Sequence, residues 1–182
     1  MTLFIFLICV TPFSAEKVEI IKEGDTRLIH LIKDVVIKNN NIEIKCMEAV
    51  LNETEGWVKL KDSVRIVEAD GVVTAGNAIY YFKKRVGYLN NNVILKREKK
   101  VISADSLFYN GKDEFVKMYS SVVIEDEVNN LKAYGSKGYY NLKDDIGYLT
   151  DNPRLEVFRE DTTPIIVTAK KFQIIADEEG SG

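Results

Sequence analysis

The chain has 182 residues, 46% of them hydrophobic, which suits one folded domain and argues against disorder of the whole chain. Its 25 Lys and Arg residues against 28 Asp and Glu residues give a net charge of −3, so there is no general basic field to hold nucleic acid. Nine Tyr, eight Phe and a single His, with many Val and Ile, favour β-structure almost throughout.

The first fifteen residues, MTLFIFLICVTPFSA, are uncharged and contain an apolar run that is too short to span a bilayer comfortably. Small residues follow the run, so residues 1–15 are expected to be a secretory signal peptide cleaved near Ala15, with residues 16–182 as one domain. An uncleaved short anchor is the alternative, because the usual basic residues at the start are missing. Cleavage would leave Cys46 as the single cysteine, so no internal disulfide is expected.

A first strand is expected over Lys17–Lys22, and the chain then repeats itself every 29 residues. Valines open four similar segments, at Val35, Val64, Val93 and Val122. A small residue recurs with the same step, at Cys46, Ala75, Ala104 and Ala133, and the units close on Leu60, Leu89, Met118 and, after 31 residues, Leu149. A fixed period of this length predicts stacked supersecondary units.

Within each unit, apolar and polar residues alternate as in a strand with one buried face, and three short strands per unit are predicted. Turn-forming residues separate them, at 39–41, 69–71, 110–113 and 129–130. The two extra residues of the fourth unit are placed within 134–138. A fifth, degraded copy begins near Asp151, and a last strand is expected over Ile165–Thr168 or Lys171–Ile174.

The alternation changes parity after the small residue of each unit. The step from Ala75 to Ala78 is odd, whereas the step from Ala78 to Tyr80 is even. A regular strand cannot make this change, so a bulge or corner is predicted at Gly76-Asn77 and at Asp105-Ser106.

The segment GVVTAGNAIYY at Gly71–Tyr81, followed by Asn91-Asn92-Val93, resembles the OstA-like repeat of the lipopolysaccharide-transport proteins LptA, LptC and the periplasmic domain of LptD. The resemblance covers Ile29 to Ala176 and lies in the fourfold recurrence rather than in one sharp motif. It implies an all-β fold of stacked repeats, an open, taco-like β-jelly roll in the periplasm. It also implies that the interior carries the acyl chains of lipopolysaccharide (lipid A) and that copies, or related Lpt domains, join end to end by strand pairing.

A carrier of acyl chains needs an apolar lining along its length, because each CH₂ kept from water contributes about 0.8 kcal/mol. The alternating positions of the repeats supply such a lining. A row of alanines either leaves a trough for the chains or marks the place where two sheets pack most closely, and the larger aliphatic residues are equally suited to an ordinary core. The candidate lipid-binding residues are Val64, Ile66, Val73, Ala75, Leu89, Val93, Leu95, Ile102, Ala104, Met118, Val122, Ile124, Leu131 and Ala133.

Aromatic and basic residues gather near the same corners and turns. Tyrosines that suit either a groove mouth or the strand surface stand at Tyr80, Tyr109, Tyr139 and Tyr140. Basic residues that suit either phosphate groups or a solvated turn stand at Lys83, Lys84, Arg85, Lys96, Arg97, Lys99 and Lys100.

An enzyme is not expected, and neither is a cofactor or a metal. His30 is the only imidazole, so a metal pair or a Ser-His relay cannot be built. Cys46 has no neighbouring base in the sequence and is expected to face the interior. The alternative function is a structural or adhesive β-solenoid whose interior is filled by its own side chains.

Overall fold

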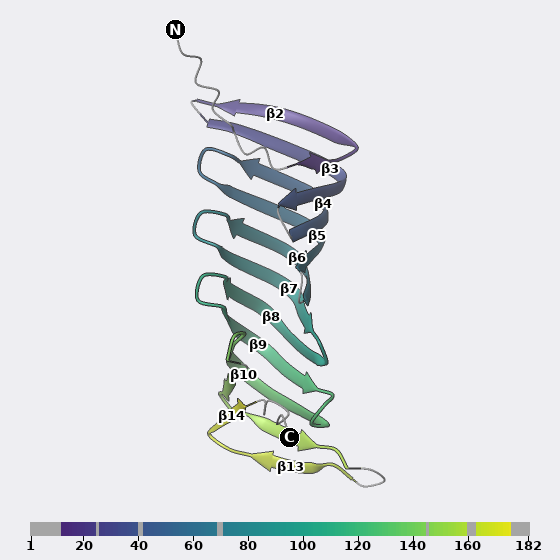
Figure 1. Cartoon of the computed structure of the whole chain (residues 1–182), viewed down its shortest axis with the longest axis vertical. Helices are drawn as coiled ribbons and strands as arrows, with labels where there is room; N and C mark the ends of the chain where they lie inside the picture. The colour runs from purple at the N-terminus through teal and green to yellow at the C-terminus, as the bar shows by residue number, and fades with distance from the viewer. Residues whose placement is uncertain are drawn as a thin grey trace, which may run out of the picture.

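The computed structural model describes residues 12–24, 26–39, 42–68, 71–144, 146–159 and 163–175, and their regular structure is β-strand. The strands stack along the long axis of the molecule, from β2 at one end to β13 and β14 at the other (Figure 1). The predicted all-β class is confirmed. The strands are β1 (Phe13–Ser14), β2 (Lys17–Glu23), β3 (Thr26–Asn39), β4 (Ile42–Asn52), β5 (Trp57–Glu68), β6 (Gly71–Tyr81), β7 (Val86–Arg97), β8 (Lys100–Asn110), β9 (Phe115–Asp126), β10 (Leu131–Asn141), β11 (Ile146–Thr150), β12 (Arg154–Val157), β13 (Ile165–Thr168) and β14 (Lys171–Ile175).

The strands form one antiparallel sheet in which each long strand pairs with its neighbours in the chain. The order is β1, β3 to β11, then β14, while β2 pairs with β3 and β12 pairs with β10 and β13. Within the described residues the two ends of this order do not pair with each other, so the sheet stays open. Each unit therefore packs on the next one, as stacked repeats do.

Each unit contains two long strands, so the prediction of three short strands is wrong. β5 and β6 have 12 and 11 residues, and β7 and β8 repeat these lengths. Each long strand bends near its middle, where the pairing shifts register, as between Lys61 and Val64. Two apparent strands are thus the halves of one strand that crosses a corner.

The corner of each of the long strands β3, β5, β7 and β9 consists of two consecutive residues with positive φ, and a similar pair follows the end of β11. Short polar side chains dominate these positions, because Asn, Asp and Ser accept the left-handed conformation or bond to their own backbone there. The even-numbered strands shift register opposite them, which confirms the predicted corners at Gly76-Asn77 and Asp105-Ser106. The corner pairs are Lys33-Asp34, Asp62-Ser63, Asn91-Asn92, Ser120-Ser121 and Asp151-Asn152.

The corners divide the sheet into two arms. Arm A holds the halves that end at the four-residue turns 53–56, 82–85 and 111–114, and arm B holds the halves that end at hairpins such as 98–99. In β5, Trp57–Lys61 belong to arm A and Val64–Glu68 to arm B. The inner faces of the two arms form one apolar cluster, so the sheet is folded over like an open jelly roll.

The two extra residues of the fourth unit lie in the β9–β10 hairpin, so their predicted place within 134–138 is wrong. β7 and β8 are joined by residues 98–99, whereas β9 and β10 are joined by the four residues 127–130. Asp126 caps this wider loop: its buried carboxylate accepts the backbone N–H groups of the second and third residues after it, at 3.0 and 3.1 Å.

The wider loop moves the residues of β10 by two positions relative to the repeat. Ile124 lies opposite Ile102 on one side and opposite Ala133 on the other. Ala133 therefore stands at the level of Ile102 rather than with the small residues. Gly135 continues that row instead, after Cys46, Ala75 and Ala104.

Candidate functional site

The inner faces of the arms carry nearly all residues that the sequence assigns to the lining. Ile66 and Val73 are partly buried and pack against the apolar cluster. Leu131, the first residue of β10, is the exception, because it is half-buried and does not belong to this cluster. The remaining predicted residues are each at most 9% exposed: Val64, Ala75, Leu89, Val93, Leu95, Ile102, Ala104, Met118, Val122, Ile124 and Ala133.

The interior also contains residues that the predicted lining omits. Most lie in arm A and recur with the same step of 29 or 31 residues as the predicted ones. The repeat itself was the signal for them, and applying its period to every alternating position would have found them. They include Ile29, Val58 and Val116, then Leu31, Leu60 and Leu149, then Ala49, Ala78 and Leu107.

The small residues stand next to the corners. Ala75 pairs with Val64, the first residue of arm B after the corner of β5, and Ala104 pairs with Val93 in the same way. The inside of a bend offers the least room, so this position favours the close-packing interpretation of the alanines.

A row of tyrosines marks the outer end of the interior in arm A. Tyr80, Tyr109 and Tyr140 occupy equivalent inward positions, and burial raises the pKa of Tyr109 to about 12. Burial also raises the pKa of Tyr80, so the phenols of Tyr80 and Tyr109 are neutral at physiological pH. Tyr139 points to the opposite face, where it belongs to a chain of ring contacts that runs from Tyr88 to Tyr148.

Polar contacts join the two arms at their outer ends, where the interior opens, and this place is called the mouth. Arg97, at the end of β7, donates from Nη1 to the carbonyl oxygen of Leu142. Lys100, at the start of β8, donates from Nζ to the hydroxyl of Tyr140 at 3.1 Å. A cavity of about 240 Å³ lies beside these contacts.

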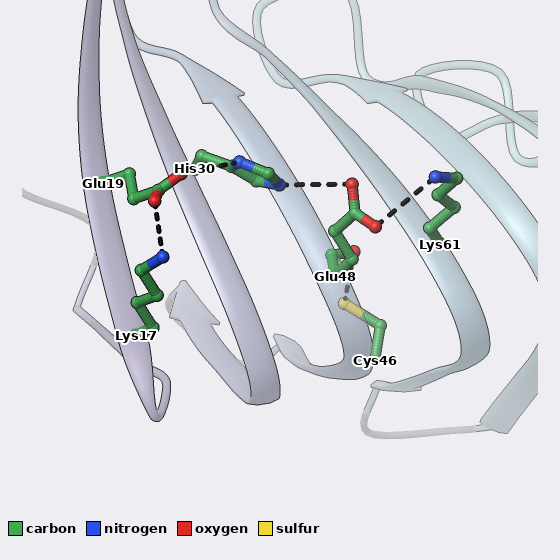
Figure 2. A network of polar contacts seen from close by, with 6 residues as sticks. All are labelled: Lys17, Glu19, His30, Cys46, Glu48 and Lys61. Atoms are coloured by element: carbon green, nitrogen blue, oxygen red, sulfur yellow. Dashed lines mark hydrogen bonds and ion pairs between the residues drawn. The ribbon is translucent and has the colours of Figure 1, made fainter.

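His30 belongs to a polar network on the outer face near β2, as Figure 2 shows. Its Nε2 lies 3.1 Å from Oε1 of Glu48, and its Nδ1 lies 3.5 Å from Oε2 of Glu19. The series ends in two lysines. Nζ of Lys61 lies 3.4 Å from Oε2 of Glu48, and Nζ of Lys17 lies 2.7 Å from Oε1 of Glu19. Because the network crosses β2, β3, β4 and β5, it ties the terminal strand to the stack.

Cys46 faces the interior, as the sequence predicts, and is 5% exposed. Its Sγ donates to the carbonyl oxygen of Glu48 at 3.2 Å (Figure 2). Burial raises the pKa of this thiol to about 11. The thiol is therefore protonated at neutral pH and is suited to packing rather than to nucleophilic attack.

The described part of the chain contains no group of three or more His, Cys, Asp or Glu residues that could hold a metal ion. No helix long and apolar enough to cross a membrane occurs among the same residues.

The sequence model of the OstA-like protein family matches residues 10–163. No curated protein is significantly similar to the chain in sequence. Among solved structures, the fold is similar to that of LptH from Pseudomonas aeruginosa, described as the LptA-homologous periplasmic component of the lipopolysaccharide transport device. The TM-score is 0.57 at 12% identity, and the match covers 70% of this chain and 93% of that one. This likeness shows the shared fold.

Proposed function

Because the chain belongs to the OstA-like protein family, we propose that it is a periplasmic transport protein that carries the acyl chains of lipopolysaccharide between its two arms. The observation that carries the proposal is the apolar interior, which continues through every unit of an open sheet. Such an interior keeps hydrocarbon from water along the length of the stack.

Crosslinking tests this cargo directly. A small diazirine amino acid placed at Val93 or Leu89, in cells that make lipopolysaccharide, is expected to form a lipid adduct. The matched controls are the neighbours Ile94 and Tyr88, which alternate to the outer face and are expected to give none. The absence of an adduct at every inward position would exclude the carrier function.

A scaffold is the second candidate, and the packing of the interior favours it. Side chains such as Met118 and Leu149 are fully buried in the apolar cluster. For a carrier, the arms therefore have to separate when a chain enters. Under the scaffold function the inward positions give no adduct although the protein is folded and exported.

The proposal includes end-to-end joining at the two ends of the sheet. β2 exposes Val18, Ile20 and Ile21, and β13 exposes Ile165 to Val167. In the described residues, β2 pairs only with β3 and β13 only with β12, so each has an edge available for another strand.

Light scattering after size exclusion tests this joining. Ile166→Lys, at a side chain 57% exposed on β13, is expected to lower the average mass at high protein concentration. Tyr88→Lys, 47% exposed in the middle of the sheet, is the control and is expected to leave the mass unchanged. A wild-type protein that is monomeric at all concentrations would contradict the proposal.

Export to the periplasm, with cleavage near Ala15, completes the proposal. Phe13 and Ser14 form β1, which pairs with Ile37 and Val36 in arm B of β3. Cleavage after Ala15 removes β1 and uncovers this edge, whereas an uncleaved anchor retains it. Mass spectrometry of the protein isolated from cells distinguishes the two by its first residue.

A further inference from the structure

A hollow of about 410 Å³, called the outer hollow, lies on the outer face of arm A over β7, β8 and β9, in the middle of the stack (Figure 1). Two rows of outward side chains cross the three strands there, because their members face one another in the pairing register. The rows are Tyr88, Phe108 and Lys117, and Asn90, Ser106 and Tyr119, and the buried Leu89 and Leu107 complete the lining. The outer hollow is therefore separated from the interior by the sheet itself.

The first of these rows begins a series of aromatic rings that follows the long axis of the stack. Ring centroids are 5.0 Å apart between Tyr88 and Phe108, and 6.0 Å apart between Phe108 and Phe115. The series continues through Tyr139 to Tyr148, with steps of 5.3 and 6.3 Å. Each strand from β7 to β11 supplies one ring, and neighbouring strands of a sheet are about 4.8 Å apart. This spacing is close to the advance of one sugar along an extended glycan.

The stack does not need these rings for its own pairing. One unit earlier, Lys59 and Ile79 form the cross-strand pair that is equivalent to Tyr88 and Phe108, and the register is the same there. Tyr88 and Tyr119 are also 47% and 41% exposed, so a large part of both rings meets solvent. Exposed aromatic surface that the fold does not require indicates a ligand.

The polar groups of the outer hollow suit a sugar better than a lipid surface. The amide of Asn90 and the hydroxyl of Ser106 both donate and accept hydrogen bonds, as sugar hydroxyls do. The two aliphatic residues of the lining are buried, so they offer no exposed side chain to hydrocarbon. Among the described residues that line the outer hollow, Lys117 is the one cation and none is a carboxylate. Charge therefore favours an acidic ligand.

We propose that the outer hollow and its series of rings bind an extended acidic glycan. The rings stack on the C–H faces of successive sugars, because an aromatic ring covers an apolar surface while its hydroxyl stays in water. Asn90 and Ser106 bond to sugar hydroxyls, and Lys117 pairs with a carboxylate of the chain. This inference does not rest on the proposed function, since the ligand lies on the opposite face of the sheet from the interior.

Calorimetric titration with three probes tests the site: cellotetraose, its C6-oxidised counterpart cellotetrauronate, and the single sugar glucuronic acid. The two tetrasaccharides share one backbone and differ in charge. Cellotetrauronate is expected to bind about threefold more tightly than cellotetraose, through one partly exposed ion pair. Glucuronic acid, which covers one ring at most, is expected to bind about tenfold more weakly than cellotetrauronate.

Two variants separate the rings from the charge. Tyr88→Thr/Tyr119→Thr keeps residues that favour strands and is expected to lower both tetrasaccharide affinities about tenfold. Lys117→Gln is expected to lower the affinity for cellotetrauronate to that for cellotetraose and to leave cellotetraose binding unchanged. Misfolding would lower both affinities, so this selective loss identifies the site.

The chain offers a matched control for each variant. Lys59 holds the position equivalent to Lys117 two units earlier, and Tyr81 lies on the same face of arm A, and both are outside the lining. Lys59→Gln and Tyr81→Thr are expected to change neither affinity by more than about twofold. Losses in these controls equal to those in the variants would reduce the effect to general attraction and overturn the site.

The probes also distinguish the glycan from other ligands. Glucuronic acid that bound as tightly as cellotetrauronate would overturn the proposal, because the site would then recognise a free anion. Wild-type protein that bound neither tetrasaccharide would overturn it as well. If that protein instead sedimented with vesicles of phosphatidylcholine and phosphatidylglycerol, and Tyr88→Thr/Tyr119→Thr did not, the face would be assigned to a membrane surface.

The crosslinking experiment at Val93 keeps this inference apart from the carrier function. The lipid adduct is expected to form equally in the wild type and in Tyr88→Thr/Tyr119→Thr. Glycan binding without any lipid adduct would support this inference and refute the carrier. A lipid adduct without glycan binding would refute this inference and support the carrier.

Discussion

Gly147 lies under the aromatic ring of Tyr140, and this contact leaves no room for a side chain. A Cβ at Gly147 would be 2.6 Å from Cδ2 of Tyr140, whose side chain is itself buried at 2% exposure. Tyr80 and Gly87 pair in the same way two units earlier. Glycine in a strand is normally a cost, so its place here follows from the ring that covers it.

We therefore expect Gly147→Ala to lower the free energy of unfolding by about 1 to 3 kcal/mol, through overpacking against the ring. Urea denaturation measures the change. In a Tyr140→Leu background the same substitution is expected to cost little, because the ring is gone. Equal costs in both backgrounds would show that the ring is not the cause.

At the level of strands, the corners depend on residues that accept positive φ. Asn91 and Asn92 form the corner of β7 with φ of 67° and 55°. A β-branched residue is strained in this conformation, whereas the ordinary extended part of the same strand accepts it readily.

Asn92→Val is accordingly expected to destabilise the protein by about 1 to 2 kcal/mol. Asn90→Val is the matched control: Asn90 is also exposed on β7 but lies before the corner, and its substitution is expected to be close to neutral. Thermal or urea unfolding of the two variants compares them. If Asn92→Val were as stable as Asn90→Val, positive φ at the corner would not be the cause of the destabilisation.

The terminal strand β2 is held partly by charge. The pKa of Glu48 is lowered, mainly by its hydrogen bond to His30 and also by Lys61. A carboxyl whose pKa is lowered in the folded state stabilises that state above its ordinary value of 4.5, and this contribution disappears as the pH falls through the lowered value.

Replacing Glu48 with Gln is expected to lower stability at pH 7 by less than about 1 kcal/mol, because the Glu48 side chain is 34% exposed and solvent screens its contacts. The loss is expected to vanish below the lowered pKa, so the variant becomes less acid-sensitive than the wild type. Urea midpoints between pH 3 and pH 7 measure this. Glu53→Gln, outside the network, serves as the control, and a deficit in Glu48→Gln that persisted at low pH would contradict the explanation.

Sequence periodicity predicted the strand-rich repeat and the pairing of each unit with the next. Nearly all of the residues that it assigned to the lining lie in the interior, but it omitted other interior residues, most of them in arm A. It predicted a corner at the parity change but divided each unit into three short strands, so it missed that each unit consists of two long, bent strands. The sequence does contain a signal for the corners, because Asp62, Asn91 and Ser120 place turn-forming residues at the same step of 29. The insertion was misplaced because glycines at 135 and 138 look like a turn, whereas the structure uses the loop capped by Asp126.

At the scale of the whole molecule, a period describes only contacts between neighbouring units. The link from Arg97 to Leu142 joins residues 45 positions apart on opposite arms, and no spacing in the sequence predicts it. It depends on how sharply the corners bend the arms toward each other. The strand ladder is therefore predictable from the repeat, while the mouth is a property of the folded shape.

If the repeat determines the ladder, one whole unit can be removed. Deleting residues 76–104 joins Ala75 to Asp105, and the hybrid strand keeps its pairing with both β5 and β9 because the deleted length is one period. The shortened protein is expected to unfold cooperatively with a β-type circular dichroism spectrum. Its urea m-value is expected to be smaller, since less surface is exposed on unfolding.

A deletion one residue shorter, 77–104, provides the control. It leaves an additional residue at the corner. In the part of the hybrid strand that belongs to arm A, this residue reverses the alternation, so the apolar side chains point to solvent and the polar ones to the core. This protein is expected to fail to fold, although it differs from the other by a single glycine. If the two deletions behaved alike, the fold would not depend on the register that the 29-residue step imposes on the stack.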